Sequence, residues 1–429
     1  MDHFTETSRT SYGENIGNSF KGIFIGFLLI IGSIILLWWN EGRSVEMTEA
    51  LGEMQQQIVT LPDSKYDAKY EGKAVLVQGL VTPLNAVVDP EFGVQTDALV
   101  LRKNVQMYQW KENTSTKTEE KLGGATETTT TYDYVKEWSS FATDSSSFKH
   151  PEGHHNPAMH HKSQTYVTDA QLGGYYLDRS MVGQISTSQT YTGLASLPEE
   201  IGVARNYHSF LYIGYAPDRP EIGDVKITYS YAPSAVYTYA AKAQAQSLVP
   251  YVTTNGKSFV FVRSGKIASQ VIFQEELDAN SMMTWILRGV GLLLMFIGFS
   301  MVMGPLATFA KVIPALGSLV GGVTGIIAGV LTLILGSIVI ALAWFGSRPL
   351  LSLGIIGTGV VIAVVMAKMG KRKEGTPTTA STPPPRASTP PPRTQAEEAE
   401  DSTVEQATPP PRNTPPKRQS GATPPPREV

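Results

Sequence analysis

The 429-residue chain contains no cysteine, and only 17% of its residues are charged. The absence of thiols excludes disulfides, thiolate zinc sites, cysteine nucleophiles and iron–sulfur clusters. A net charge of −3 argues against the basic domain or stripe that is typical of a nucleic-acid-binding protein. The motifs of serine hydrolases and phosphate-binding loops are also missing. We therefore predict no enzymatic activity, no cofactor and no nucleic-acid partner.

The apolar residues, 42% of the chain, are gathered in long runs. A transmembrane helix needs about 20 consecutive apolar residues. The first run is too long for a signal peptide, and it ends in Trp38 and Trp39, an interfacial aromatic pair, rather than in a cleavage site. The sequence therefore predicts a membrane protein with four transmembrane helices, at residues 22–39, 285–303, 316–345 and 349–366.

Lysine and arginine set the orientation of membrane helices, because they are enriched on the cytoplasmic side. Lys21 precedes the first run, Lys311 lies between the second and third, and four basic residues follow the last. We therefore predict that both termini are cytoplasmic, with an N-terminal segment at residues 1–21 and an extracytoplasmic (periplasmic or luminal) domain at residues 40–284. The basic residues after the fourth run should attract anionic lipid headgroups; they are Lys368, Lys371, Arg372 and Lys373.

Two arginines, Arg43 and Arg288, fall on the side that the charge bias disfavours. Each lies at the end of an apolar run, so we expect both side chains to extend to the membrane interface.

The extracytoplasmic segment is long enough for a core of its own. Residues 45–61 have helical spacing and are expected to extend the first helix as a stalk. Beyond Lys73, β-branched and aromatic runs predict strands, at residues 74–81, 98–110, 126–138, 210–215, 224–232, 258–263 and 267–273. Gly123-Gly124 and Ser264-Gly265-Lys266 mark two hairpins. The predicted fold is a mainly-β (α+β) domain, with sandwich and barrel both open.

Five of the seven histidines are clustered in the sequence. Imidazole nitrogens bind zinc or copper, so these histidines are weak candidates for a metal site. Their spacing fits no standard zinc motif, and no thiolate or HExxH helix supports them. We expect no metal at these residues, which are His150, His154, His155, His160 and His161.

Glycine recurs every four residues in the third apolar run, at Gly317, Gly321, Gly325 and Gly329. Such a helix face has no side chains, so another helix can approach it closely. The partner is either a helix of the same chain or a second chain. Gly22 and Gly26 form a shorter version of this pattern in the first run.

The C-terminal region, residues 371–429, is rich in proline and contains TPPPR four times, beginning at Thr382, Thr389, Thr408 and Thr423. Proline triplets favour an extended polyproline helix and cannot form a packed core. We predict a disordered tail, which is either a solvated spacer or a multivalent docking segment for cytoplasmic proteins.

Several blocks together resemble the LUMA (transmembrane protein 43) family. The most specific is WWNEGR directly after the first run, made of Trp38, Trp39, Asn40, Glu41, Gly42 and Arg43. Further blocks are YEGKAVLVQGL (residues 70–80), DPEFGV (89–94), LRKNVQMYQWKE (101–112), GHHNPAM (153–159), GDVKITYSYA (223–232), LVPYVTTNG (248–256) and NSMMTWILRGVG (280–291). The resemblance covers roughly residues 18–370, in order. Because GHHNPAM contains His154 and His155, part of the histidine cluster is expected to be structural.

The resemblance implies four spans, a large luminal domain and no established enzymatic activity. For eukaryotic members it implies residence in the endoplasmic reticulum and inner nuclear membrane, self-association, and envelope organisation with lamins and emerin. The Pro-rich tail is not a family mark and leaves open a bacterial member, which would lie in the cytoplasmic membrane and have no lamin partner. The leading hypothesis is a self-associating membrane scaffold that contacts lipid. The alternative is a ligand-binding membrane sensor.

Overall fold

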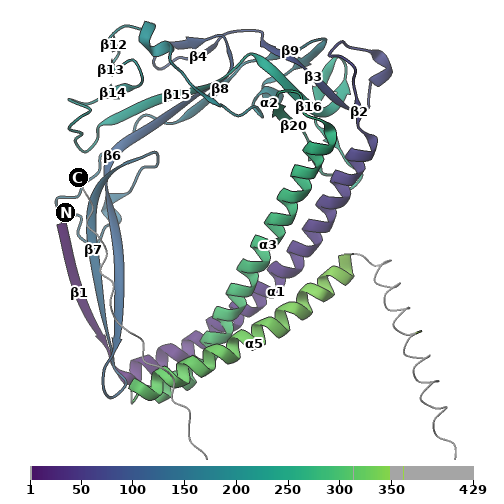
Figure 1. The fold of residues 1–429 in the computed structure, drawn as a ribbon. Coiled ribbons are helices and arrows are strands. Elements are labelled where there is room, and N and C mark those ends of the chain that lie inside the picture. Colours follow the sequence, from purple (N-terminus) through teal and green to yellow (C-terminus); the bar gives the residue numbers. More distant parts are fainter. Residues whose placement is uncertain (1, 313, 348–360, 362–429) are drawn as a thin grey trace, which may run out of the picture. The chain divides into compact units, whose positions relative to one another are not determined.

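The computed structural model describes residues 2–312, 314–347 and 361 of the chain (Figure 1). The predicted fourth helix, the basic residues after it and the Pro-rich tail therefore lie outside the described residues.

Three long helices carry the apolar runs in the described part of the chain. They are α1 (Tyr12–Gln57), α3 (Ser269–Val302) and α5 (Pro314–Ser347), and each is long and apolar enough to cross a membrane. The short helix α4 (Gly304–Ala310) links α3 to α5. In the apolar part of α1 the exposed large side chains are hydrophobic, as at Phe24, Ile31 and Ile35. Apolar exposure of this kind suits contact with lipid. The first three predicted membrane helices are thus confirmed as long apolar helices.

Helix α1 begins at a capping box, in which Ser11 accepts a hydrogen bond from the Glu14 backbone and the Glu14 side chain bonds back. It then continues well beyond its apolar run, as predicted for the stalk. Its last turns enter the β domain, where Leu51 and Met54 are buried in one core with Ile272 and Phe273 of α3.

One strand prediction was wrong at this junction. Residues 267–273 were expected to form the second strand of a hairpin, but α3 begins at Ser269. Ile272 and Phe273 are buried against the α1 end of the domain, which a helix permits. Tertiary packing therefore overrides the β propensity of this short apolar run. Strand β20 (Phe261–Ser264) pairs instead with β16 (Ala235–Gln244).

The mainly-β domain is confirmed, and most of its strands form two sheets (Figure 1). The nine-stranded sheet contains β1 (Asp2–Thr10), β7 (Thr126–Ser139), β6 (Ala98–Glu120), β15 (Val225–Pro233), β14 (Leu211–Ile213), β13 (Ala204–Asn206) and β12 (Glu200–Ile201) in that order, with β11 (Gln189–Thr190) on β15 and β8 (Gln164–Val167) on β6.

The seven-stranded sheet contains β2 (Val59–Thr60), β3 (Ala74–Pro83), β9 (Ala170–Leu172), β10 (Tyr175–Leu177), β17 (Ser247–Val249), β16 and β20, with β3 also paired to β16. Two small hairpins, β4 (Val87–Asp89) with β5 (Val94–Thr96) and β18 (Tyr251–Val252) with β19 (Ser258–Phe259), and a short helix α2 (Arg179–Val182) complete the elements used below.

The two sheets share a core. Val77 of β3 and Tyr239 of β16 are fully buried in one cluster with Leu99 and Val100 of β6. Apolar residues that alternate along these strands point into this core, which explains why strand-like alternation was visible in the sequence.

The hairpin between β6 and β7 is confirmed, and Gly123 and Gly124 adopt positive φ angles of 86° and 78° at its turn. Strand β1 pairs with β7 along its whole length, from Asp2 opposite Tyr134 to Thr10 opposite Thr126. Residues 2–10 therefore share a sheet with a strand of the domain. The predicted location of residues 1–21 in the cytoplasm and of residues 40–284 across the membrane stays a prediction.

Candidate functional site

A layer of polar side chains lies between α1 and α3, at the end of their apolar segments. Glu41 of α1 is almost completely buried and accepts hydrogen bonds from Arg288 of α3, at 2.6 Å to Oε1 and 2.8 Å to Oε2. The Arg288 guanidinium also lies 4.8 Å from the ring centre of Trp285. A two-pronged contact of this kind fixes both the rotation and the register of the two helices.

Arg43 completes the layer. It donates hydrogen bonds to the Asn280 and Thr284 side-chain oxygens, at 3.0 Å each. Asn40 is fully buried and donates to the Thr284 carbonyl at 3.0 Å. Each of the two arginine side chains finds partners on the facing helix, and the place of Arg43 and Arg288 at the membrane interface stays a prediction. The layer joins the WWNEGR block to the NSMMTWILRGVG block. No property of either block alone indicates that they pair.

Trp38 and Trp39 lie just before this layer, and both rings are more than half exposed. An exposed indole pair at the end of an apolar helix suits the membrane interface, as predicted.

Glycines bring α1 and α3 into close contact within their apolar segments. A Cβ atom at Gly26 of α1 would lie 2.6 Å from the Gly298 carbonyl oxygen of α3, and one at Gly298 would lie 2.8 Å from the Gly26 carbonyl oxygen. A Cβ atom at Gly336 of α5 would likewise collide with the side chain of Leu292, so glycine makes room for that leucine. The weaker glycine pattern of the first run thus marks a real helix crossing.

The glycine face predicted in α5 is largely open. A methyl group added at Gly321 or Gly325 would meet no atom within 4 Å, and one at Gly329 would meet only Phe296, at 3.9 Å. The surroundings of Gly317 lie outside the described residues. Within the described part of the chain, this face is not used for packing against another helix.

The five clustered histidines do not come together around one point. His154 is buried, stacks on Tyr134 with ring centres 3.9 Å apart, and contacts Asp2 of β1 at 3.0 Å. His150 stacks on Phe4 of the same strand. His161 contacts Glu91 at 2.5 Å instead, whereas His155 and His160 are exposed. No group of three or more potential metal ligands exists among the described residues. His150 and His154 instead help to hold strand β1.

A second polar cluster, which sequence patterns did not predict, is buried in the β domain. Lys103 of β6 is only 1% exposed, and its ammonium group contacts both Glu91 and, at 3.4 Å, the fully buried Asp89. Tyr166 and Tyr229 donate hydrogen bonds to the two Asp89 carboxylate oxygens, at 2.6 and 2.7 Å. The DPEFGV block thus supplies the carboxylates of this cluster. The only sequence signal was a lysine within an apolar strand.

Burial and hydrogen bonding change the acidity of this cluster. Burial raises the pKa of Tyr229, and its hydrogen bond to Asp89 raises that pKa further. The same two causes raise the pKa of Tyr166. Burial alone would raise the pKa of Glu91, but hydrogen bonds from Lys103 and His161 outweigh it and lower the pKa. The charges are therefore compensated inside the domain, as expected of a structural network.

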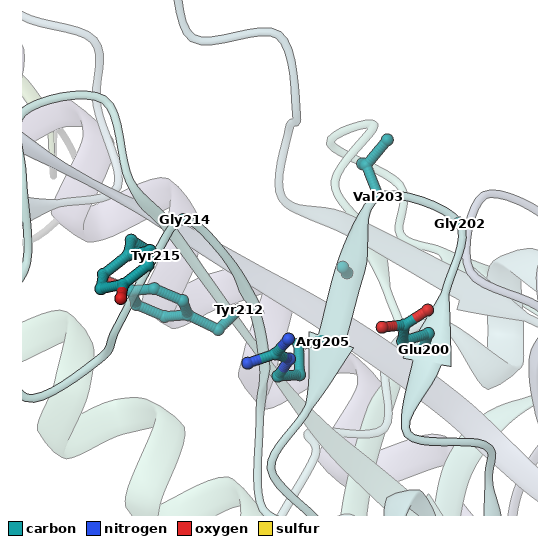
Figure 2. Close-up of a pocket in the computed structure, with 8 residues that line it drawn as sticks. Glu200, Gly202, Val203, Arg205, Tyr212, Gly214 and Tyr215 are labelled. Atoms are coloured by element: carbon teal, nitrogen blue, oxygen red, sulfur yellow. The ribbon is translucent and has the colours of Figure 1, made fainter.

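An open cavity of about 330 Å³ lies on the surface of the nine-stranded sheet, at strands β12, β13 and β14. Figure 2 shows Arg205 between Tyr212 and Glu200, with Val203 at the turn that joins β12 to β13. Tyr215 and Val203 are strongly exposed at its rim. A guanidinium, a carboxylate and exposed apolar side chains in one cavity can contact a small polar ligand or a peptide.

The apolar helices, the polar layer between them and the attached domain define an integral membrane protein with a β-rich domain on a helical stalk. The family model "Transmembrane protein 43" matches residues 107–349. Transmembrane protein 43 of Mus musculus is 29% identical over 86% of this chain and 95% of the relative. The Homo sapiens protein is 29% identical over 84% and 92%, and the Drosophila melanogaster homolog is 30% identical over 67% and 78%. The chain belongs to the transmembrane protein 43 family. No solved structure matches it.

Proposed function

We propose that the chain is a non-enzymatic membrane scaffold that self-associates and organises the membrane or envelope in which it lies. The observation that carries this proposal is the unbroken helix pair. Helices α1 and α3 run from the membrane into the core of the β domain, and the Glu41–Arg288 contact locks them together on the way. A rigid connection of this kind holds the domain at a set orientation to the bilayer.

A clamp at the top of the stalk strengthens the connection. Glu53 of α1 accepts hydrogen bonds from Thr254 and Tyr251, and Gln57 accepts one from Tyr251 at 2.7 Å. Lys257 forms an ion pair with Glu46 at 3.1 Å. The loop between β18 and β19 thereby holds α1 from the side, which favours a structural role over a hinge.

Self-association has a candidate surface in the open face of α5 around Gly321 and Gly325. A second copy or the predicted fourth helix (349–366) would fit against it. Native mass spectrometry of the untagged full-length protein in a mild detergent distinguishes contact with a second copy from contact with the fourth helix of the same chain. We expect a defined oligomer that Gly321→Leu with Gly325→Leu reduces to a monomer. The matched control, Gly322→Leu, changes the adjacent position, which is also open.

A monomer across several detergents would contradict self-association. An oligomer that survives both leucines would move the contact to another surface. We also propose that the tail docks cytoplasmic proteins. The location of the tail and of Lys311 in the cytoplasm is tested by protease protection in sealed vesicles. In a eukaryotic cell, envelope organisation would involve lamin- and emerin-type partners in the endoplasmic reticulum or inner nuclear membrane. In a bacterium, the scaffold would lie in the cytoplasmic membrane.

The cavity beside Arg205 favours a second candidate function, a membrane sensor that binds a ligand in its β domain. This function predicts that a ligand raises the Tm of the full-length protein and that Arg205→Gln removes the increase. It also predicts a change in proteolysis of the tail when the ligand binds. A broad screen of lipids, sugars and peptides without either effect would argue against it.

A further inference from the structure

A three-stranded ribbon extends from the nine-stranded sheet (Figure 1). We use "the ribbon" for β1 together with residues 112–120 of β6 and residues 126–134 of β7. Strand β7 lies in the middle, with β1 on one side and β6 on the other. In the described part of the chain, β1 pairs only with β7, and so do residues 112–120 of β6. Each outer strand therefore has one edge of unpaired backbone groups.

The tip of the ribbon contacts the helix ends that lie farthest from the β domain. Glu120 forms an ion pair with Lys311 at 2.8 Å, and the Gly123 N–H donates to the Val312 carbonyl at 3.1 Å. Asn15 of α1 donates to the Gly124 carbonyl at 3.0 Å. The opposite end of α1, at Gln57, enters the domain from which the ribbon starts. The ribbon and the helices are therefore joined at both ends.

Their lengths agree with this arrangement. Strand β6 has 23 residues and α1 has 46. At about 3.3 Å per strand residue and 1.5 Å per helix residue, both span roughly 70 Å. Residues 112–120 alone span about 26 Å, close to the roughly 30 Å hydrocarbon core of a bilayer. A membrane that surrounds the apolar part of the helices consequently surrounds the ribbon as well.

The ribbon is not built for contact with lipid. The ribbon segments of β6 and β7 read ENTSTKTEE and TETTTTYDY, and β1 reads DHFTETSRT, so polar residues occupy both faces. Open sheet edges do not occur in hydrocarbon, because each unpaired N–H or C=O is costly there. The ribbon therefore needs water beside its faces and a strand at each edge.

We propose that the ribbon crosses the membrane inside an assembly of copies of this chain, where β1 of one copy pairs with residues 112–120 of the next copy. The closed sheet encloses water and the apolar helices face lipid. The proposal rests on the self-association proposed above and adds a second contact surface to the open face of α5. Closed sheets of small barrels have about eight strands, so three strands per copy require at least three copies, and an interior that holds water requires more.

The strand directions and charges fit this contact. Both β1 and β6 are antiparallel to β7, so they are parallel to each other and pair in parallel between copies. Arg9 and Glu119 both lie opposite Glu127, at one level of the ribbon. Arg9 of one copy therefore lies within a short stagger of Glu119 of the next, so the two charges face each other across the contact. The arrangement also keeps Lys21 and Lys311 at the cytoplasmic face, while residues 2–10 return across the membrane.

The chain lacks cysteine, so introduced cysteines report directly on strand pairing. Glu6 and Thr116 both lie opposite Thr130 and are separated by β7 within one copy. That separation is about 10 Å, whereas a disulfide requires Cα atoms closer than about 7 Å. Glu6→Cys is combined in turn with Thr114→Cys, Thr116→Cys and Thr118→Cys, which allows for the stagger of a closed sheet. The full-length variants are oxidised in native membranes and run on non-reducing gels.

We expect at least one double variant to form a ladder that reaches trimers and beyond, while each single variant yields no species larger than a dimer. Glu6→Cys with Thr130→Cys is the matched control and should give a disulfide within one chain. The proposal is overturned if this control disulfide forms but none of the three pairs gives a ladder. It is also overturned if the control disulfide does not form, because β1 is then not part of the ribbon.

Water beside the ribbon is tested with single cysteines in sealed vesicles. Thr130→Cys lies at the centre of the middle strand, and Ile31→Cys replaces a side chain of α1 that is 54% exposed. We expect a charged thiol reagent to modify Thr130→Cys at least tenfold faster than Ile31→Cys. Equal, slow rates would place the ribbon centre in an environment without water. That result would refute the proposal that the ribbon crosses the membrane beside enclosed water. An oligomer in native mass spectrometry without a ladder would leave the scaffold proposal standing and refute only this one.

Discussion

The crossing of α1 and α3 predicts a large difference between two alanine substitutions in the same helix. At Gly298, the new methyl group would lie 2.8 Å from the Gly26 carbonyl oxygen and 2.8 Å from Ile30 Cγ1. Backbone oxygen cannot rotate away, so the two helices must separate. At Gly289, a methyl group meets no atom within 4 Å.

The two substitutions share the same gain in helix propensity, about 1 kcal/mol in a helix interior. The difference between them is therefore the overpacking at the crossing, about 1–3 kcal/mol. With a Tm change of about 2–4 °C per kcal/mol for domains of 150–250 residues, Gly298→Ala should unfold roughly 2–12 °C below Gly289→Ala. The assay is thermal unfolding of the purified full-length protein in one mild detergent, followed by intrinsic tryptophan fluorescence.

A third variant separates steric clash from general disturbance of the helix. Gly32→Ala in α1 also meets no atom within 4 Å and should behave like Gly289→Ala. Equal Tm values for all three variants would refute the reasoning, because they would show that the α1–α3 crossing does not hold the helices at this distance.

Three further outcomes follow from the buried charges. Arg288→Met leaves the Glu41 carboxylate buried without its partner and should destabilise the protein by about 3–5 kcal/mol, whereas Glu41→Met with Arg288→Met should recover most of that loss; a double variant as unstable as the single one in denaturant unfolding would contradict this. Lys103→Met should cost at least as much as a typical core substitution, about 2–5 kcal/mol, because Asp89 then stays buried without a cation; an unchanged unfolding midpoint would show that Asp89 does not depend on Lys103. Because the pKa of Tyr229 is raised in the folded protein, this tyrosine's contribution to stability is fully present below about pH 10 and is lost as pH rises further; in Tyr229→Phe, the loss of unfolding free energy between pH 9 and 11 should be smaller, and an identical loss would argue against the raised pKa.

Local patterns predicted much of the architecture. Strands β3, β6 and β15 appear where β-branched and aromatic residues alternate, because their apolar residues pack into the two core clusters of the domain. The strand prediction at residues 267–273 was wrong, because a pattern of only seven residues does not distinguish a strand from the first turns of a buried helix. Only the contact of Ile272 and Phe273 with the end of α1 decides between them.

The polar layer between α1 and α3 also shows that a local sequence pattern does not indicate which distant residues will meet in a site. The WWNEGR block stands out by its resemblance to the family and its place after the first apolar run. Its partners lie about 240 positions later in the chain, as in Glu41 with Arg288 at a separation of 247. Spacing within a helix says nothing about which helix faces it. The sequence therefore contains no sign that Arg43 and Arg288 are each held by the facing helix.

What the amino-acid sequence determined by itself was everything that depends on short-range pattern: the apolar helices, the absence of thiol chemistry, the hairpin at Gly123-Gly124 and the family. Tertiary structure alone decided which distant segments meet. It buried Lys103 against Asp89, crossed Gly26 with Gly298, and paired β1 with β7. The physical reason is that hydrophobic periodicity is a property of neighbouring residues, whereas ion pairs, close backbone contacts and strand edges are satisfied by groups from anywhere in the chain.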